Sequence, residues 1–295
     1  MSDIFDRKTM NDIWGNEPIL ALPPTPQFSP ANAFHLPCFI ETVHTRKTAD
    51  LCSALQQTRT MGLLVGLPGV GKTWAVQHAA LQQHQPELII ASPVLYTSVD
   101  VENNPHALLA NILTCLGPDY RAPVPDMISM TCCWIHRRQV GLILLDEAER
   151  LDKKSLQVIQ DIYDRTRCAF LFIGEFGLIH MFRRNSELHN RIGITLEISP
   201  LTFDELDKFL CAWLDLHSKD KNDTHPRGEL FLVPDDRTEE DWILLKEIYR
   251  ITQGNLRRLC FLVQEAERIA AVNRQPYVQL AVLQAATRLL NGTAQ

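Results

Sequence analysis

The sequence predicts an α/β fold with a parallel sheet flanked by helices, followed by a small α-helical domain. Short apolar runs alternate with helical stretches in the first two thirds of the chain, and this alternation is typical of crossovers between parallel strands. After Pro200 the strand signals stop and only helical periodicity remains. The expected strands are Gly62–Val65, Val94–Ser98, Gly141–Leu145, Ala169–Ile173 and Ile194–Ile198.

These patterns divide the chain into three parts. Residues 1–36 contain several prolines and little periodicity, which predicts an extended N-terminal arm. Residues 37–199 form the expected α/β core, and residues 200–295 the expected helical domain. The core should open with a helix over Glu41–Thr58. In the last part we expect helices at Leu201–Leu216, Glu239–Thr252, Asn255–Val272 and Gln279–Leu290, with an acidic surface loop at Ser218–Asp236.

Composition limits the classes of protein to consider. With 45% apolar and 22% charged residues among 295, the chain can bury a sizeable core, which excludes disordered and collagen-like classes. A net charge of −6 argues against bulk electrostatic binding to DNA. No apolar run approaches the length of a membrane span, so no membrane partner is expected. The eight cysteines include no C-x-x-C pair, and reduced thiols in a cytoplasmic protein are the simpler interpretation.

The strongest local signal is the segment Gly66–Thr73, which fits the phosphate-binding pattern G-x-x-x-x-G-K-[ST]. An apolar strand leads into it and a helix leads out of it. Its glycines let backbone N–H groups converge on phosphate oxygens, and the helix N-terminus adds partial positive charge. Lys72 would reach the β- and γ-phosphates of ATP, and the Thr73 hydroxyl would ligate Mg²⁺. The expected nucleotide-binding residues here are Gly66, Leu67, Pro68, Gly69, Val70, Gly71, Lys72, Thr73 and Trp74.

A second signal is the pair Asp146 and Glu147 at the end of an apolar strand. Four apolar residues before the pair fit a central parallel strand buried on both faces. Its carboxyl end is where such sheets bind ligands. Asp146 would hold the Mg²⁺ hydration shell, and Glu147 would orient or deprotonate the attacking water.

Together with the helical domain after about residue 200, these motifs resemble the AAA+ ATPases, and the resemblance implies ATP hydrolysis with Mg²⁺. The strand Leu171–Glu175 lies where that family places its first sensor, usually Asn, Thr or Asp, so Glu175 departs from the pattern. The segment Gly254–Leu259 resembles the second sensor, and Arg257 matches the arginine that touches the γ-phosphate.

The segment Glu187–Arg191 resembles the part of AAA+ proteins that supplies an arginine finger to a neighbouring subunit. Arg191 fits best, with Arg183 and Arg184 as alternatives. Arginine suits this role because its guanidinium keeps its charge and stabilises the transferring phosphoryl group.

Within that class the chain resembles transposition ATPases of the TniB, TnsC and MuB type. The resemblance rests on Asp146–Leu151, Phe172–Gly174, Pro200–Thr202 and a core without a further catalytic domain. It implies a protein of the prokaryotic cytosol that forms homo-oligomeric rings or helical filaments on double-stranded DNA with ATP. It further implies recruitment of a transposase, through a target-selection protein of the TniQ type.

DNA contacts are less specified by the sequence. After Val94–Ser98 the chain has Asp100, Glu102, Asn103 and Asn104 rather than lysine. By charge alone the candidates are Arg121, Arg137, Arg138, Lys153 and Lys154, for which a solvated surface is the simpler interpretation. An assembly along the duplex could still add up weak contacts. Two alternative functions remain open: a replication or helicase-loading ATPase, and a nucleotide-dependent interaction switch with little turnover.

Overall fold

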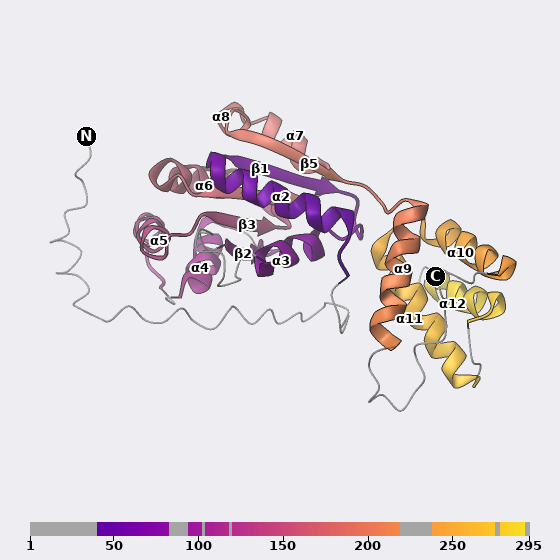
Figure 1. The fold of residues 1–295 in the computed structure, drawn as a ribbon. Coiled ribbons are helices and arrows are strands. Elements are labelled where there is room, and N and C mark those ends of the chain that lie inside the picture. Colours follow the sequence, from indigo (N-terminus) through magenta and orange to yellow (C-terminus); the bar gives the residue numbers. More distant parts are fainter. Residues whose placement is uncertain are drawn as a thin grey trace.

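The structure, a computed structural model, describes residues 40–82, 94–101, 104–117, 120–218, 238–274 and 278–292. A five-stranded, fully parallel sheet forms the centre of the first part, with the order β2-β3-β4-β1-β5 (Figure 1). The strands are β1 (Met61–Gly66), β2 (Val94–Ser98), β3 (Leu142–Asp146), β4 (Ala169–Gly174) and β5 (Ile192–Ile198). All five expected strands therefore exist, and the predicted parallel α/β architecture is confirmed.

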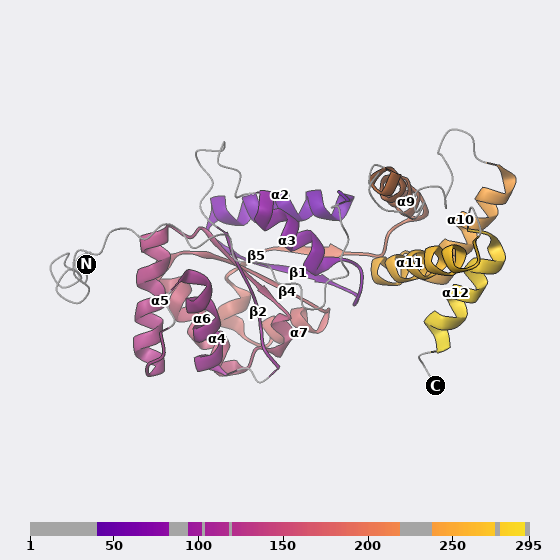
Figure 2. The same ribbon diagram turned by 90° about the horizontal axis from the view of Figure 1, so that it is seen from below.

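Helices cover both faces of the sheet, as the two views in Figures 1 and 2 show. One face packs against α2 (Val43–Thr58) and α3 (Lys72–Gln82) through small and branched apolar side chains. The opposite face carries a larger apolar cluster. Its helices are α4 (Pro105–Leu116), α5 (Val124–Arg138), α6 (Lys153–Thr166), α7 (Gly177–Arg183) and α8 (Ser186–His189), and a 3₁₀ turn, η1 (Ala148–Arg150), follows β3.

Burial explains why the strands are continuous apolar runs. Every residue of β1, β3 and β4 is buried, because helices cover the sheet on both sides. Alternate side chains point to opposite faces: Leu63 and Val65 enter the larger cluster, whereas Leu64 enters the other. The edge strand β5 alternates between half-buried and exposed residues instead.

Among the described residues, four further helices follow β5 and enclose an apolar cluster of their own, which includes Trp213 and Ile40. They are α9 (Phe203–Ser218), α10 (Glu239–Thr252), α11 (Leu256–Val272) and α12 (Leu280–Gly292), and we call them the lid. In both views the lid lies beyond the end of β5, to one side of the sheet (Figures 1 and 2). The proposed boundary at residue 199 falls between β5 and α9. The predicted arm, residues 1–36, and residues 219–236 of the predicted acidic loop lie outside the described residues.

The register of the sheet aligns the ends of the strands that matter for chemistry. Val65 pairs with Gly174, Gly66 with Ile198, and Ser98 with Asp146. The carboxyl ends of all five strands therefore meet at one edge, where ligands of parallel sheets bind. In the described residues no helix has both the length and the apolar character that crossing a membrane requires.

Candidate functional site: a phosphate-binding loop at the carboxyl edge of the sheet

The loop between β1 and α3 has the backbone that its glycines were expected to provide. Gly69 and Gly71 take φ values of +81° and +100°, a region in which a residue with a Cβ is strained. The loop ends at Lys72, where α3 begins, so its last residues present free N–H groups and the positive end of the helix dipole. Trp74 lies in the first turn of the same helix.

Lys72 folds back over the loop. Its Nζ donates hydrogen bonds to the carbonyl oxygens of Gly66 at 2.9 Å and Leu67 at 3.0 Å. Burial lowers the pKa of the Lys72 ammonium, while the nearby carboxylates of Glu149, Asp146, Glu175 and Glu147 act in the opposite direction. The ammonium therefore lies near four carboxylates, and their negative charge favours its charged form.

Asp146 and Thr73 come together across the edge of the sheet. The Thr73 hydroxyl donates to Asp146 Oδ2 at 2.7 Å, and the Tyr96 hydroxyl donates to the same oxygen at 2.9 Å. Asp146 Oδ1 accepts from the Glu147 N–H at 2.9 Å. The buried Asp146 is thus fixed by three donors. A hydroxyl and a carboxylate side by side next to a phosphate-binding loop are oxygen ligands of the kind that Mg²⁺ accepts, so these residues fit that ion.

Tyr96 was not predicted as a site residue. It lies in the middle of β2, and its hydroxyl reaches Asp146 on the neighbouring strand. Burial and the charge of Asp146 raise the pKa of this phenol, which therefore stays a neutral hydrogen-bond donor. The pattern of β2 alone could not identify the contact, because it depends on which strand lies beside β2.

Glu147 adopts the left-handed backbone conformation, with φ of +56°, at the turn between β3 and η1. Its carboxylate forms an ion pair with Arg150 at 3.3 Å, and 44% of its side chain is exposed. Arg150 also donates to the Val99 carbonyl at 3.1 Å. The predicted water-orienting acid thus lies at the same edge of the sheet as the phosphate-binding loop and is paired with a neighbouring cation.

A second acid of this turn, Glu149, points inward. Its Oε2 is buried and has no hydrogen-bond partner among the described residues. It lies so close to Gly174 that a Cβ at position 174 would collide with it. Burial raises the pKa of this carboxyl, and the charges of Glu147 and Glu175 add to the effect. Glu149 lies within the motif Asp146–Leu151, but its place in that motif indicates no role, because a buried carboxylate oxygen is visible only in three dimensions.

The two sensor candidates occupy different positions around the loop. Glu175 follows β4 at the same edge as Asp146 and is exposed. Arg257 lies in the first turn of α11, and its backbone N–H donates to the Gly69 carbonyl at 2.9 Å. The structure therefore places this lid arginine directly beside the phosphate-binding loop.

Arg191 lies at the opposite edge of the sheet from the loop. It precedes Ile192, which pairs with Met61 at the start of β1, whereas the loop follows Gly66 at its end. A five-residue rise in a strand is roughly 17 Å, beyond the reach of an arginine side chain. Arg191 therefore cannot act on the phosphate-binding loop of its own chain.

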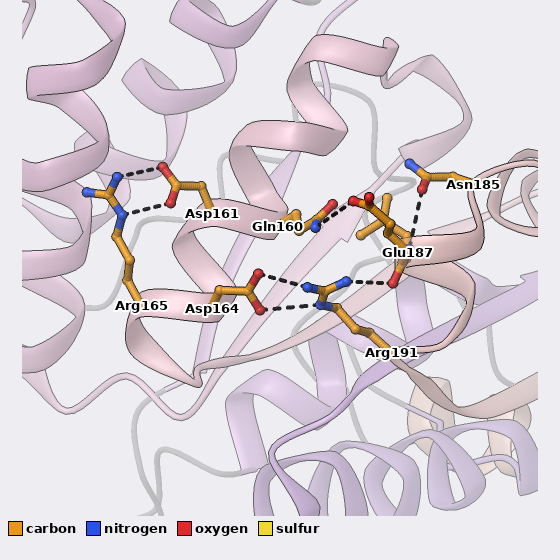
Figure 3. A network of polar contacts seen from close by, with 8 residues as sticks. Gln160, Asp161, Asp164, Arg165, Asn185, Glu187 and Arg191 are labelled. Carbon is orange, nitrogen blue, oxygen red and sulfur yellow. Dashed lines mark hydrogen bonds and ion pairs between the residues drawn. The ribbon is translucent and has the colours of Figure 1, made fainter. Parts of the chain in front are cut away.

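Figure 3 shows how Arg191 is held. Its guanidinium donates to both carboxylate oxygens of Asp164, at 3.3 and 2.8 Å, and to the Glu187 carbonyl at 2.6 Å (Figure 3). Its alternatives Arg183 and Arg184 end α7 and are exposed.

The candidate DNA-binding residues do not gather in one place. Lys153 and Lys154 are exposed in the first turn of α6, after β3, and Arg121 is exposed just before α5. Arg137 and Arg138 instead stack over the Trp134 ring, each at 5.2 Å from its centroid. They end α5, only three residues before the start of β3, and so lie toward the other edge of the sheet.

The described residues form a parallel α/β domain with a phosphate-binding loop at the carboxyl edge of its sheet, followed by a helical lid. Residues 55–182 match the sequence profile of an AAA domain family. A protein of Staphylococcus aureus described as a potential ATP-binding protein is 25% identical over 279 residues, which cover 84% of this chain and 94% of that protein.

Solved structures show the same fold at low sequence identity. The Orc1 protein of Aeropyrum pernix, in a structure with DNA, superposes with a TM-score of 0.62 at 18% identity, covering 85% of this chain. The chain spans 66% of the length of that Orc1 chain, slightly under two thirds. RuvB of Thermotoga maritima, a Holliday junction branch migration motor, gives a TM-score of 0.53 at 19% identity, over 86% of this chain and 70% of RuvB.

Proposed function

We propose that this protein is an ATP-hydrolysing AAA+ subunit that assembles on duplex DNA and regulates transposition. The observation that carries the proposal is the separation of two halves of a hydrolysis site. The phosphate-binding loop and the acids lie at one edge of the sheet, and Arg191 lies at the other. A subunit built in this way needs a neighbour to complete its site.

The loop would bind the triphosphate of ATP through its N–H groups and Lys72, with Arg257 approaching from the lid. Thr73 and Asp146 would hold Mg²⁺, and the ion would neutralise the charge that develops on the phosphates. Glu147 would orient or deprotonate the attacking water. Its ion pair with Arg150 at 3.3 Å competes with the water for Oε2 of this carboxylate, so the ion pair must loosen for that step.

Arg191 would complete the site of a neighbouring subunit. It offers a fixed positive charge, and it lies too far from its own loop to act there. In the single chain it pairs with Asp164, so assembly must exchange one anionic partner for another, the γ-phosphate of the neighbour. ATP would thereby stabilise the oligomer, and hydrolysis would release it.

The DNA-bound assembly is supported by the fold. The Orc1 structure of similar fold contains DNA, and RuvB of similar fold is a branch migration motor. With a net charge of −6, a single subunit has little attraction for DNA, so binding would depend on contacts repeated along an oligomer. Lys153 and Lys154 are the exposed pair that we propose for such contacts, together with Arg121.

Transposase and a target-selection protein of the TniQ type are the partners that we propose for this assembly. The main alternative is a replication or helicase-loading ATPase, which the fold similarity to Orc1 favours. A pull-down that recovers a transposase, or instead a replicative helicase, separates these two roles.

Turnover of ATP with and without duplex DNA tests the proposed activity and the alternative of a switch with little turnover. Glu147→Gln should retain ATP but lose most hydrolysis, and it should prolong the DNA-bound assembly, because amides cannot accept the proton of water. Lys72→Ala should lose nucleotide retention itself. If Glu147→Gln hydrolysed ATP at the parental rate, the role of Glu147 would be wrong. If the unaltered protein showed no turnover with DNA, the switch would be favoured.

A further inference from the structure

The first turn of α11 lies directly on the phosphate-binding loop. The Asn255 side chain donates through Nδ2 to the Pro68 carbonyl at 2.8 Å, and the Arg257 N–H donates to the Gly69 carbonyl at 2.9 Å. A Cβ on Gly69 would come within 2.6 Å of Asn255 Oδ1, and one on Gly71 within 2.8 Å of the Leu256 side chain. The loop and the lid helix are thus packed together with no room for a side chain between them.

Asn255 has two roles at once. As the N-cap of α11, it accepts a hydrogen bond from the Arg258 N–H through Oδ1 at 3.2 Å. Serine, threonine or aspartate would cap the helix equally well. None of these carries an amide donor, and it is the amide nitrogen that reaches the loop. The cap therefore explains an oxygen at this position, but it does not explain why the side chain is an asparagine.

The chain segment that connects core and lid is fastened at the same place. The Leu201 N–H, just before α9, donates to the Gly254 carbonyl at 2.9 Å, and Gly254 has φ of +71°. Gly254 packs so closely on the Leu201 backbone that a Cβ would collide with it. The residue before Asn255 is therefore tied to the connection from β5, and the Asn255 and Arg257 hydrogen bonds join the start of α11 to the loop.

We propose that Asn255 is a positioning residue whose amide latches the lid to the phosphate-binding loop, and that this latch slows the release of nucleotide. The inference rests on the proposed binding of nucleotide at this loop. Phosphates held by the loop have the first turn of α11 as their neighbour, with Arg257 two residues beyond the latch. Moving the lid away from the loop must break the Asn255 hydrogen bond.

Two substitutions separate the latch from the cap. Asn255→Ser keeps an oxygen that can cap α11 but removes the amide donor, whereas Asn255→Ala removes both. We expect both variants to release mant-ADP with Mg²⁺ about fivefold faster in a stopped-flow chase, the effect of one neutral hydrogen bond. We expect Asn255→Ala to lower the midpoint of thermal unfolding further than Asn255→Ser, because both variants lose the latch but only the alanine variant also loses the cap.

The same helix offers a matched control. Asn273, at the other end of α11, donates through Nδ2 to the Ile269 carbonyl at 2.8 Å and has no hydrogen bond to the loop. Asn273→Ser should leave mant-ADP release unchanged. Release from Asn255→Ser at the parental rate would overturn the latch while leaving the nucleotide site intact. If mant-ADP bound equally to the unaltered protein and to Lys72→Ala, the proposed nucleotide site would be wrong, and the latch with it.

Discussion

Glu149 makes the stability of the protein depend on pH in a direction that can be worked out. Burial raises the pKa of its carboxyl above the ordinary value of 4.5, so the folded protein binds this proton more tightly than the unfolded chain. The contribution of this carboxyl to the free energy of unfolding is fully present below the ordinary pKa of 4.5. It is lost as the pH rises through the pKa that the carboxyl has in the folded protein. Glu149→Gln should therefore raise the free energy of unfolding at pH 8, with a smaller gain at pH 5. Urea titrations at the two pH values measure this difference, and a gain that grew on acidification would contradict it.

Gly174 and Glu149 should be energetically coupled, because the carboxylate occupies the space that a Cβ would need. Gly174→Ala should lower the free energy of unfolding by about 1 kcal/mol, since it displaces the tip of a flexible side chain rather than backbone. In a Glu149→Ala background the same substitution should cost almost nothing. Gly177→Ala is the control, because a Cβ there has no neighbour within 4 Å. Chemical denaturation of the four variants and the parent gives the coupling, and equal costs in both backgrounds would exclude it.

At the scale of elements, α6 carries two bidentate ion pairs, one within the helix itself and one to the residue that precedes β5. Asp161 pairs with Arg165 on the same helix, whereas Asp164 pairs with Arg191 ahead of β5 (Figure 3). Both pairs are partly exposed, so the loss of either should cost no more than about 1 kcal/mol. Only Asp164→Ala removes the carboxylate partner of Arg191, and it should lower the protein concentration at half-maximal ATP hydrolysis severalfold. Asp161→Ala should not, and an equal response of both variants would refute a specific restraint.

The strands β1, β3 and β4 were predictable because burial on both faces makes each one a continuous apolar run. β2 occurs at the expected residues, Val94–Ser98, and the other four differ by one or two residues at their ends. The phosphate-binding loop was predictable because the residues that would bind phosphate are consecutive in the sequence, from Gly66 to Thr73. The order of strands was not, since each pairing depends on contacts between distant parts of the chain.

The sequence also could not predict those contacts of the site that join residues far apart along the chain. Tyr96 and Asp146 are 50 residues apart, and Asn255 and Pro68 are 187 apart. No contiguous sequence pattern around Tyr96 or Asn255 identifies the residue that its side chain contacts. Glu149 shows the same limit at close range, because its buried carboxylate oxygen lies against Gly174, 25 residues further along the chain.

At the scale of the whole molecule, the positions of Lys72 and Arg191 at opposite edges of the sheet predict complementation between defective subunits. Lys72→Ala removes the phosphate contact of a subunit but leaves its Arg191 intact, and Arg191→Ala does the reverse. Neither variant should hydrolyse ATP alone. In an equal mixture, about one interface in four pairs an intact loop with an intact arginine, so about a quarter of the parental activity should return if subunits associate head to tail at random. Steady-state hydrolysis at saturating ATP and duplex DNA measures this recovery.

Arg183→Ala and Arg184→Ala, each mixed with Lys72→Ala, are the controls for that complementation. If one of them, and not Arg191→Ala, is inactive alone and recovers on mixing, then the arginine that crosses the interface is the one at the end of α7. If Arg191→Ala, Arg183→Ala and Arg184→Ala all retain full activity alone, no subunit needs one of these arginines from its neighbour, and the proposal of a site shared between subunits fails. Recovery should also fall as the total protein concentration is lowered, because the active interface exists only in the assembled state.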